Sequence, residues 1–172
     1  MYKEDEGGNP DSSVSDDDDK KFIERNLTKH RMKGANAQKD LTAQMSDLHL
    51  GEPKNLIEMS KCIEQIHDHV NEKDNESLKA HIYVGEQFHL YQCIFKRLKK
   101  KSDGKTTWKS WLKNSVKTCG SYVYRHIQIY HLTAEYPGLR ELSISFTRLF
   151  LMQGKIKSIF SRNPQLANEW KK

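Results

Sequence analysis

The chain has 172 residues, 35% of them hydrophobic, and a mean hydropathy of −0.86, which leaves room for one domain of ordinary size and a polar remainder. No apolar run reaches the length of a membrane span, and the acidic N-terminus has no apolar signal segment, so we expect neither a transmembrane helix nor a secretory signal. The three cysteines are far apart and form no CxxC pair. This argues against a disulfide framework or a zinc site and favours a reducing compartment.

Charge is distributed unevenly along the chain. Residues 1–20 have a net charge of −6, whereas the whole chain has a net charge of +6, so residues 21–172 must have a net charge of +12. Residues 96–125 contain ten basic residues and a single acid, Asp103. Such clustering is typical of a protein that binds polyanions.

Residues 1–52 are predicted to be a disordered acidic tail and tether. The stretch MYKEDEGGNPDSSVSDDDDK has too few large apolar side chains to offset the entropy of ordering it. Residues 21–50 are ambiguous, because Phe22, Ile23 and Leu27 could line a short helix that orders on a partner, while a plain tether is as consistent with the pattern. A further hypothesis is that the acidic tail lies across the basic surface and competes with nucleic acid.

Two helices are predicted in the first half of a domain that spans residues 53–172. Apolar residues recur at spacings of 3, 4, 3 and 4 from Leu56 to Val70, which is a helical pattern, and Pro53 suits the start of that helix. A second helix is expected from about Ser77 to Lys101. Gly85 inside it costs about 1 kcal/mol relative to alanine, so we expect another backbone to approach closely there.

The second half of the domain is also predicted to be helical. Thr106 or Thr107 caps a short helix that ends near Asn114 and points Trp108 and Trp111 inward. The segment SVKTCG forms a turn, and a longer helix begins at about residue 121 and ends at YPG, residues 136–138. Three further short helices follow up to residue 172. Since no segment alternates like a strand, we expect an all-α fold.

A short helix, a tight turn and a longer helix match helix-turn-helix geometry, in which the second helix enters the major groove of DNA. Arg125 and Gln128 have the chemistry to contact guanine and adenine edges, respectively, and the nearby lysines would meet phosphates. The predicted DNA-binding residues are Lys105, Lys109, Lys113, Lys117, Thr118, Ser121, Tyr122, Tyr124, Arg125 and Gln128.

The same pattern has other interpretations. Aromatic residues in two successive helices usually form a core, and lysine runs are often no more than solvated surfaces. The stripe from Leu56 to Val70 and the apolar late helices, including Leu151, could dock a larger protein in an assembly module without nucleic-acid binding. We favour the interpretation in which both close the domain's own core. We also expect His126 and His131 at the edge of the packed surface.

The string WKSWLK…CGSYVYRHIQIYHLTAEYPGLRELSISFTRL, residues 108–149, resembles a small helix-turn-helix family found in phage, bacterial and some eukaryotic proteins. The resemblance extends over residues 78–160, with Gly85 at the family's glycine. More narrowly, the chain resembles the small homeobox-like accessory subunits of ciliate DNA adenine-N6 methyltransferase complexes. Residues 121–135 depart from a true homeodomain recognition helix, because they contain no Trp-Phe-x-Asn and no basic tail. That departure favours contacts with the DNA backbone, or a protein–protein role, over base-specific reading.

The narrower resemblance implies a nuclear, non-catalytic subunit that helps a complex engage double-stranded DNA. The implied partners are a methyltransferase catalytic subunit, an inactive methyltransferase-like partner and a second DNA-binding accessory subunit.

Residues that would support catalysis are not evident in the sequence. There is no GxGxxG, no P-loop and no Asp-Pro-Pro-aromatic motif, so we expect no enzyme activity and no cofactor, S-adenosylmethionine included. His67 and His69 point about 160° apart on a helix, so a shared metal ion is not expected either.

Overall fold

The computed structural model describes residues 16–31, 52–72, 78–100, 105–116 and 118–172. Over these ranges the fold is all-α, as predicted, with seven α-helices and two short 3-10 helices, and the described residues form no strand. The elements are α1 (Asp16–Asn26), η1 (Thr28–His30), α3 (Leu56–Glu72), α4 (Leu78–Lys99), α5 (Trp108–Ser115), α6 (Gly120–Glu135), η3 (Pro137–Glu141), α7 (Phe146–Arg162) and α8 (Pro164–Trp170).

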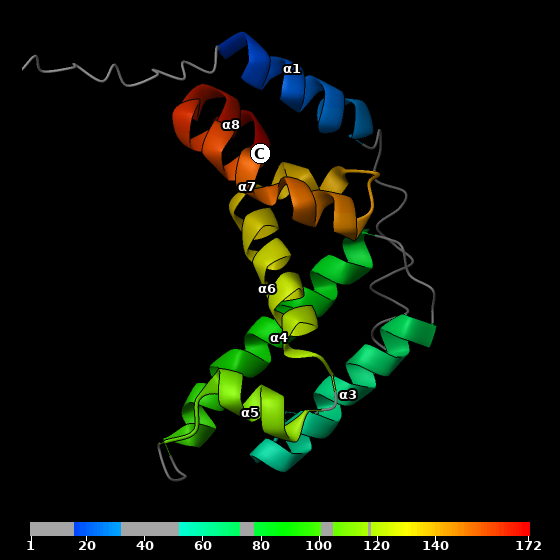
Figure 1. Ribbon diagram of the computed structural model, residues 1–172, viewed down its shortest axis with the longest axis vertical. Coiled ribbons are helices and arrows are strands. Elements are labelled where there is room, and N and C mark those ends of the chain that lie inside the picture. The colour runs from blue at the N-terminus through cyan, green and yellow to red at the C-terminus, as the bar shows by residue number, and fades with distance from the viewer. Residues whose placement is uncertain (1–15, 32–51, 73–77, 101–104, 117) are drawn as a thin grey trace, which may run out of the picture.

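Helices α4 and α6 pack against each other in the middle of an elongated molecule (Figure 1). Helices α3 and α5 lie at one end, and α1, α7 and α8 lie at the other (Figure 1). Each end has its own buried apolar cluster, and α4 and α6 contribute residues to both clusters. The two central helices therefore connect two cores within one structure.

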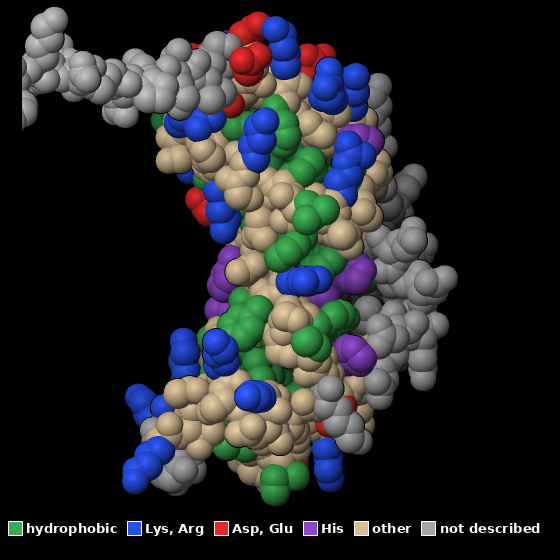
Figure 2. Space-filling model, viewed as in Figure 1, with side chains coloured by type: hydrophobic (Ala, Val, Ile, Leu, Met, Phe, Trp, Pro, Cys, Tyr) green, Lys and Arg blue, Asp and Glu red, His purple; other side chains and the backbone are tan. Residues whose placement is uncertain are grey.

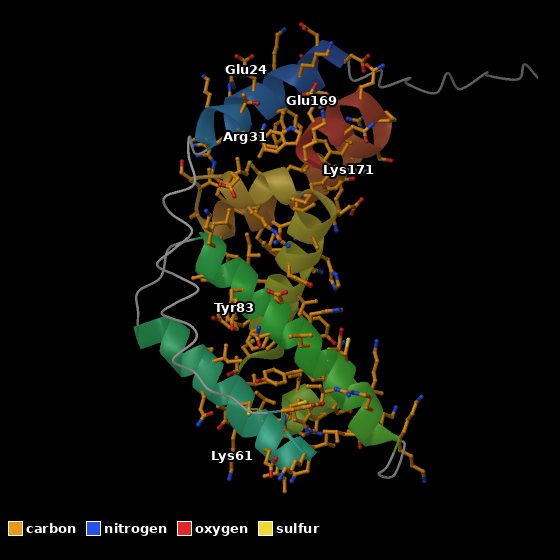
Figure 3. All side chains as sticks on the ribbon, turned by 180° about the vertical axis from the view of Figure 1, so that it is seen from behind. Glu24, Arg31, Lys61, Tyr83, Glu169 and Lys171 are labelled. Atoms are coloured by element: carbon orange, nitrogen blue, oxygen red, sulfur yellow. The ribbon has the colours of Figure 1, made fainter. Side chains whose placement is uncertain are left out.

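The core at the α3–α5 end is built by the residues whose spacing predicted the helices. Met59 and Ile63 of α3 are fully buried, and they pack with Phe88 of α4 and Trp111 of α5. Seen from behind in Figure 3, α3, marked by Lys61, lies alongside the lower part of α4. The buried part of the α3 stripe thus closes the protein's own core, which confirms the favoured alternative. The side chain of Val70 lies outside the described residues.

The core at the opposite end includes a segment that we predicted to be disordered. Ile23 of α1 and Leu27 after it are buried against α6, α7 and α8. The buried carboxylate of Asp19 accepts two hydrogen bonds from Nη2 of Arg162, at 3.0 and 2.9 Å, at the end of α7. The prediction was wrong for residues 16–31, because two apolar side chains and one paired carboxylate suffice to attach this short segment. The rest of the predicted tail, residues 1–15 and 32–51, lies outside the described residues.

Residues after α1 extend this attachment. His30 and Arg31 run beside the segment that precedes α7, where Ser143 donates its backbone N–H to the His30 carbonyl at 2.6 Å and Arg31 forms an isolated bridge with Leu142. The Arg31 guanidinium lies 5.1 Å from the centre of the Trp170 ring of α8, and Figure 3 shows Arg31 at this end of the molecule. The four aspartates that begin α1 therefore lie at the α7–α8 end, away from α5 (Figure 1).

The crossing of α4 and α6 depends on Gly85. A β-carbon at this position would lie 2.2 Å from the carbonyl oxygen of His126 and 2.9 Å from Cβ of Tyr130, both on α6. No other amino acid fits without moving one helix. This confirms the prediction that another backbone approaches Gly85 closely.

His126 is buried at the same crossing, which corrects the expectation that it lies at the edge of the packed surface; His131 is exposed, as expected. Nδ1 of His126 donates to the Tyr122 carbonyl at 2.8 Å, since a carbonyl only accepts. Nε2 of the neutral ring then accepts from Nδ1 of His81, 2.9 Å away. Burial is the main cause that lowers the pKa of His126 to about 4, so the ring is neutral at physiological pH.

Candidate nucleic-acid interface

Helix α5 separates an aromatic face from a lysine face. Its N-terminus is closed by a capping box, in which Oγ1 of Thr107 accepts from the Ser110 N–H at 3.1 Å and Oγ of Ser110 accepts from the Thr107 N–H at 3.0 Å. Trp108 and Trp111 stack with ring centres 5.3 Å apart, and both contact Phe95 of α4. Both tryptophans belong to the core, as predicted.

The two lysines of α5 lie on the opposite, solvent-exposed side, and Lys105 precedes the helix. Lys105, Lys109 and Lys113 are all exposed, and their spacing of four residues places Lys109 and Lys113 on one face of the helix. Within the part of the chain that the structure describes, neither Lys109 nor Lys113 forms an ion pair. The sequence contains no aspartate or glutamate from Lys105 to Ala134. Around Lys109 and Lys113 the described surface is therefore positively charged.

The turn between α5 and α6 presents fewer DNA-binding side chains than we predicted. Thr118 is only 5% exposed, so it packs inward and does not present its hydroxyl to a duplex. The physical reason is that the chain between α5 and α6 must cover the core, where Val116 is also buried. Lys117, predicted to contact phosphate, lies outside the described residues.

The first turns of α6 divide the predicted residues between surface and core. Ser121 is exposed and Tyr124 is half-buried. Tyr122 turns inward, with its ring 4.2 Å from that of His126 and 5.0 Å from that of His67. Burial raises the pKa of its hydroxyl to about 12. The prediction that Tyr122 faces DNA needs correction, because its position on the helix points toward α4.

Arg125 and Gln128, the two candidate base readers, are exposed but engaged by α7. The Arg125 guanidinium lies 5.3 Å from the centre of the Phe150 ring, and Oε1 of Gln128 is 3.5 Å from the donor Nε2 of Gln153. Neither Phe150 nor Gln153 was among the predicted site residues. Local sequence carries no signal for these contacts, since they depend on how α7 packs across α6.

A cleft of about 500 Å³ opens beside the start of α6, between α6, the start of α7 and His81 of α4. Its lining includes Cys119, Ser121 and Arg125 and, from α7, Phe146. Hydrogen bonds from the Ser121 hydroxyl and from the backbone N–H groups of Ser121 and Tyr122 lower the pKa of the Cys119 thiol. None of the described residues that line this cleft is an aspartate or a glutamate.

The described residues contain neither a candidate membrane span nor a candidate metal site. No described helix is long and apolar enough to cross a membrane. The described ranges contain no group of three or more histidine, cysteine, aspartate or glutamate side chains placed to hold a metal ion. Comparison of the chain with protein-family models, with curated proteins and with solved structures found no match.

Proposed function

We propose that this chain is a non-catalytic protein that binds double-stranded DNA through the exposed side of α5 and the adjoining part of α6. The observation that carries the proposal is the thirty-residue stretch from Lys105 to Ala134, which contains five basic residues and no acid and whose described basic side chains are all exposed. A surface of this kind attracts the phosphate backbone and releases its counterions. The positions of Lys109 and Lys113, one helical turn apart, suit successive phosphate contacts.

We also propose that α5, its following turn and α6 act as a homeobox-like helix-turn-helix. The short capped helix and the longer helix after it support that proposal. Thr118 and Tyr122 are buried or turned inward, and Arg125 and Gln128 contact α7, so few side chains are left to read base edges. Binding should therefore depend on the backbone and show little preference for sequence.

The test is fluorescence anisotropy of the full chain on a short labelled duplex over a series of salt concentrations. If about four to six phosphates are neutralised, the log–log salt slope should be about −4 to −5. The triple variant Lys109→Gln, Lys113→Gln and Arg125→Gln should lose most of this affinity.

The control variant Lys29→Gln, Lys61→Gln and Lys172→Gln removes the same charge from exposed positions elsewhere and should bind almost as the wild type does. Equal loss in the two variants would mean that total charge, and not this surface, attracts DNA. No binding by the folded wild-type chain at about 50 mM salt would refute the proposal.

The wider role rests only on the resemblance of the chain to small homeobox-like accessory subunits. In that proposal the chain is an accessory subunit of a nuclear DNA adenine-N6 methyltransferase complex and helps it engage duplex DNA. Its partners would be the catalytic subunit, the methyltransferase-like subunit and a second DNA-binding accessory subunit. Co-purification with these three proteins, and adenine methylation measured with and without this chain, tests the role. Methylation that does not change when the chain is omitted would contradict it.

A protein-docking module without DNA binding is the second candidate. Leu151 of α7 is 77% exposed, which is unusual for a large apolar side chain on an otherwise packed helix. Replacing it by glutamate should leave folding intact and, if α7 docks a partner, abolish co-purification with that partner. Retained co-purification would remove Leu151 from the docking surface.

A further inference from the structure

The proposed function rests on one stretch without acidic residues, and a second such stretch follows it in the sequence after Glu135 and Glu141. No aspartate or glutamate occurs between Glu141 and Glu169, and this stretch includes the whole of α7 with four basic residues. Helix α7 packs directly against α6. We propose that the DNA-binding surface continues from α5 across the exposed side of α6 onto α7, where Lys157 contacts a phosphate and Phe150 positions Arg125. This inference rests on the proposed function and deepens it.

Two side-chain contacts connect α6 to α7 along this surface, and a third pair of residues follows them in the same order on both helices. Arg125 lies over Phe150, and Gln128 is hydrogen-bonded to Gln153. In the third pair, Lys157 lies close enough to His131 for its charge to contribute, after burial and the neighbouring His89, to lowering the pKa of His131. The pairs form a continuous seam of cationic, amide and aromatic groups that contains no carboxylate.

Lys157 differs from the other three basic residues of α7 because they contact α1. Arg148 donates to Oδ1 of Asn26 at 3.3 Å, Lys155 lies 4.3 Å from the centre of the Phe22 ring, and Arg162 pairs with Asp19. All three therefore contact α1. Lys157 is exposed, and it follows Phe150 by seven residues and Gln153 by four, which places it on the face of α7 that contacts α6. It is the residue of α7 that is placed to extend the lysine surface of α5.

The shape of this side of the molecule fits a duplex lying across it. Figure 2 shows the left edge hollowed at the level of α6, with histidine side chains in the hollow and lysine and arginine side chains above and below it. A rod-shaped polyanion placed in such a hollow meets positive charge on both sides, which argues for DNA in preference to a protein partner. Since α7 borders α6 here, the duplex would lie across both helices, and α6 would not enter a groove alone. Glu135, a negatively charged residue at the end of α6, marks the limit of the proposed DNA-binding surface along this helix.

Two lysines on the same helix provide a matched test. The full chain and the single variants Lys157→Gln and Lys155→Gln are titrated onto the labelled duplex over the same salt series. Loss of one phosphate contact should reduce the magnitude of the log–log slope by about 0.9 in Lys157→Gln. Lys155→Gln loses the same charge on the α1 side and should keep the wild-type slope. Equal slopes for Lys157→Gln and Lys155→Gln would overturn the inference. The proposed function would still stand if the triple variant Lys109→Gln, Lys113→Gln and Arg125→Gln remained defective in binding. Absence of wild-type binding would overturn both.

The role of Phe150 as a positioning residue needs a separate readout. In Phe150→Leu the ring is replaced by an apolar side chain, so the packing of α7 is largely kept while the Arg125 guanidinium loses its aromatic contact. We expect Phe150→Leu to weaken DNA binding in the chain that has Arg125 and to have no effect in the chain that has Arg125→Gln. Equal weakening in both backgrounds would show that Phe150 acts only through folding and would refute the positioning role.

Discussion

Replacing a single glycine by alanine at two positions should change stability in opposite directions. Gly85 lies in α4 and Gly154 in α7, both inside helices, where alanine is preferred to glycine by about 1 kcal/mol. At Gly154 a new β-carbon meets nothing within 4 Å, so the full preference should appear as added stability. At Gly85 it would lie 2.2 Å from the carbonyl oxygen and 2.8 Å from the carbonyl carbon of His126.

The cost at Gly85 can be worked out from these distances. Non-bonded heavy atoms are at their optimal separation at about 3.5 Å, so α4 and α6 must move apart by about 1 Å. Overpacking of a core costs about 1–3 kcal/mol, and here the obstacle is backbone that cannot rotate aside, which places the cost at the upper end. After the gain in helix propensity, Gly85→Ala should lower the free energy of unfolding by about 2 kcal/mol.

Urea unfolding followed by far-ultraviolet circular dichroism measures both variants against the wild type. Gly154→Ala should be more stable by up to about 1 kcal/mol, and Gly85→Ala less stable by about 2 kcal/mol, a difference of about 3 kcal/mol between two identical substitutions. If Gly85→Ala is as stable as the wild type, α4 and α6 do not cross as closely as described, and the reasoning about the centre of the molecule fails.

Three further outcomes follow from the structure. Asp19→Ala should lower the free energy of unfolding in urea by about 1–3 kcal/mol, because it removes a buried, hydrogen-bonded carboxylate. The control Asp17→Ala, at a fully exposed position, should change the stability little. Similar losses in the two variants would contradict the attachment of α1. The pKa of His126 is about 4 in the folded chain and about 6.5 when unfolded, so the unfolded chain binds the extra proton. Stability should therefore fall by about 2 kcal/mol from about pH 7.5 to about pH 5, and a flat profile would refute a neutral buried ring. Cys119 is exposed with a lowered pKa, and Cys62 is half-buried with a pKa raised mainly by burial, so iodoacetamide should alkylate Cys119 faster than Cys62. Mass spectrometry measures both sites, and a faster reaction at Cys62 would contradict this.

The helices were predictable where the apolar spacing was regular. Met59 and Ile63 are buried at the positions that the helical period requires, and Trp108 and Trp111 follow the same rule. Gly85 was predictable for a different reason, since glycine inside a long helix is costly unless a neighbour demands it. Each of these predictions needed only residues that lie close together in the sequence.

The features that could not be predicted depend on distant residues. Asp19 is attached by Arg162, 143 residues away, and nothing in the aspartate run itself distinguishes it from the exposed Asp17. In the same way, the surroundings of Arg125 and Gln128 are set by α7. Periodicity gave their position on the exposed side of α6 but not the partners that hold them.

The contacts of α7 connect the acidic N-terminal helix to the proposed DNA surface. Arg148, Lys155 and Arg162 each contact a side chain of α1, so three of the four basic residues of α7 are engaged by α1. Lys157 is left beside His131, in line with the seam that contains Arg125. The described part of the acidic segment therefore does not compete with DNA by covering the α5 lysines. Because the other basic side chains of α7 contact α1, Lys157 is the basic residue of α7 that is left to extend the proposed surface of α5 and α6.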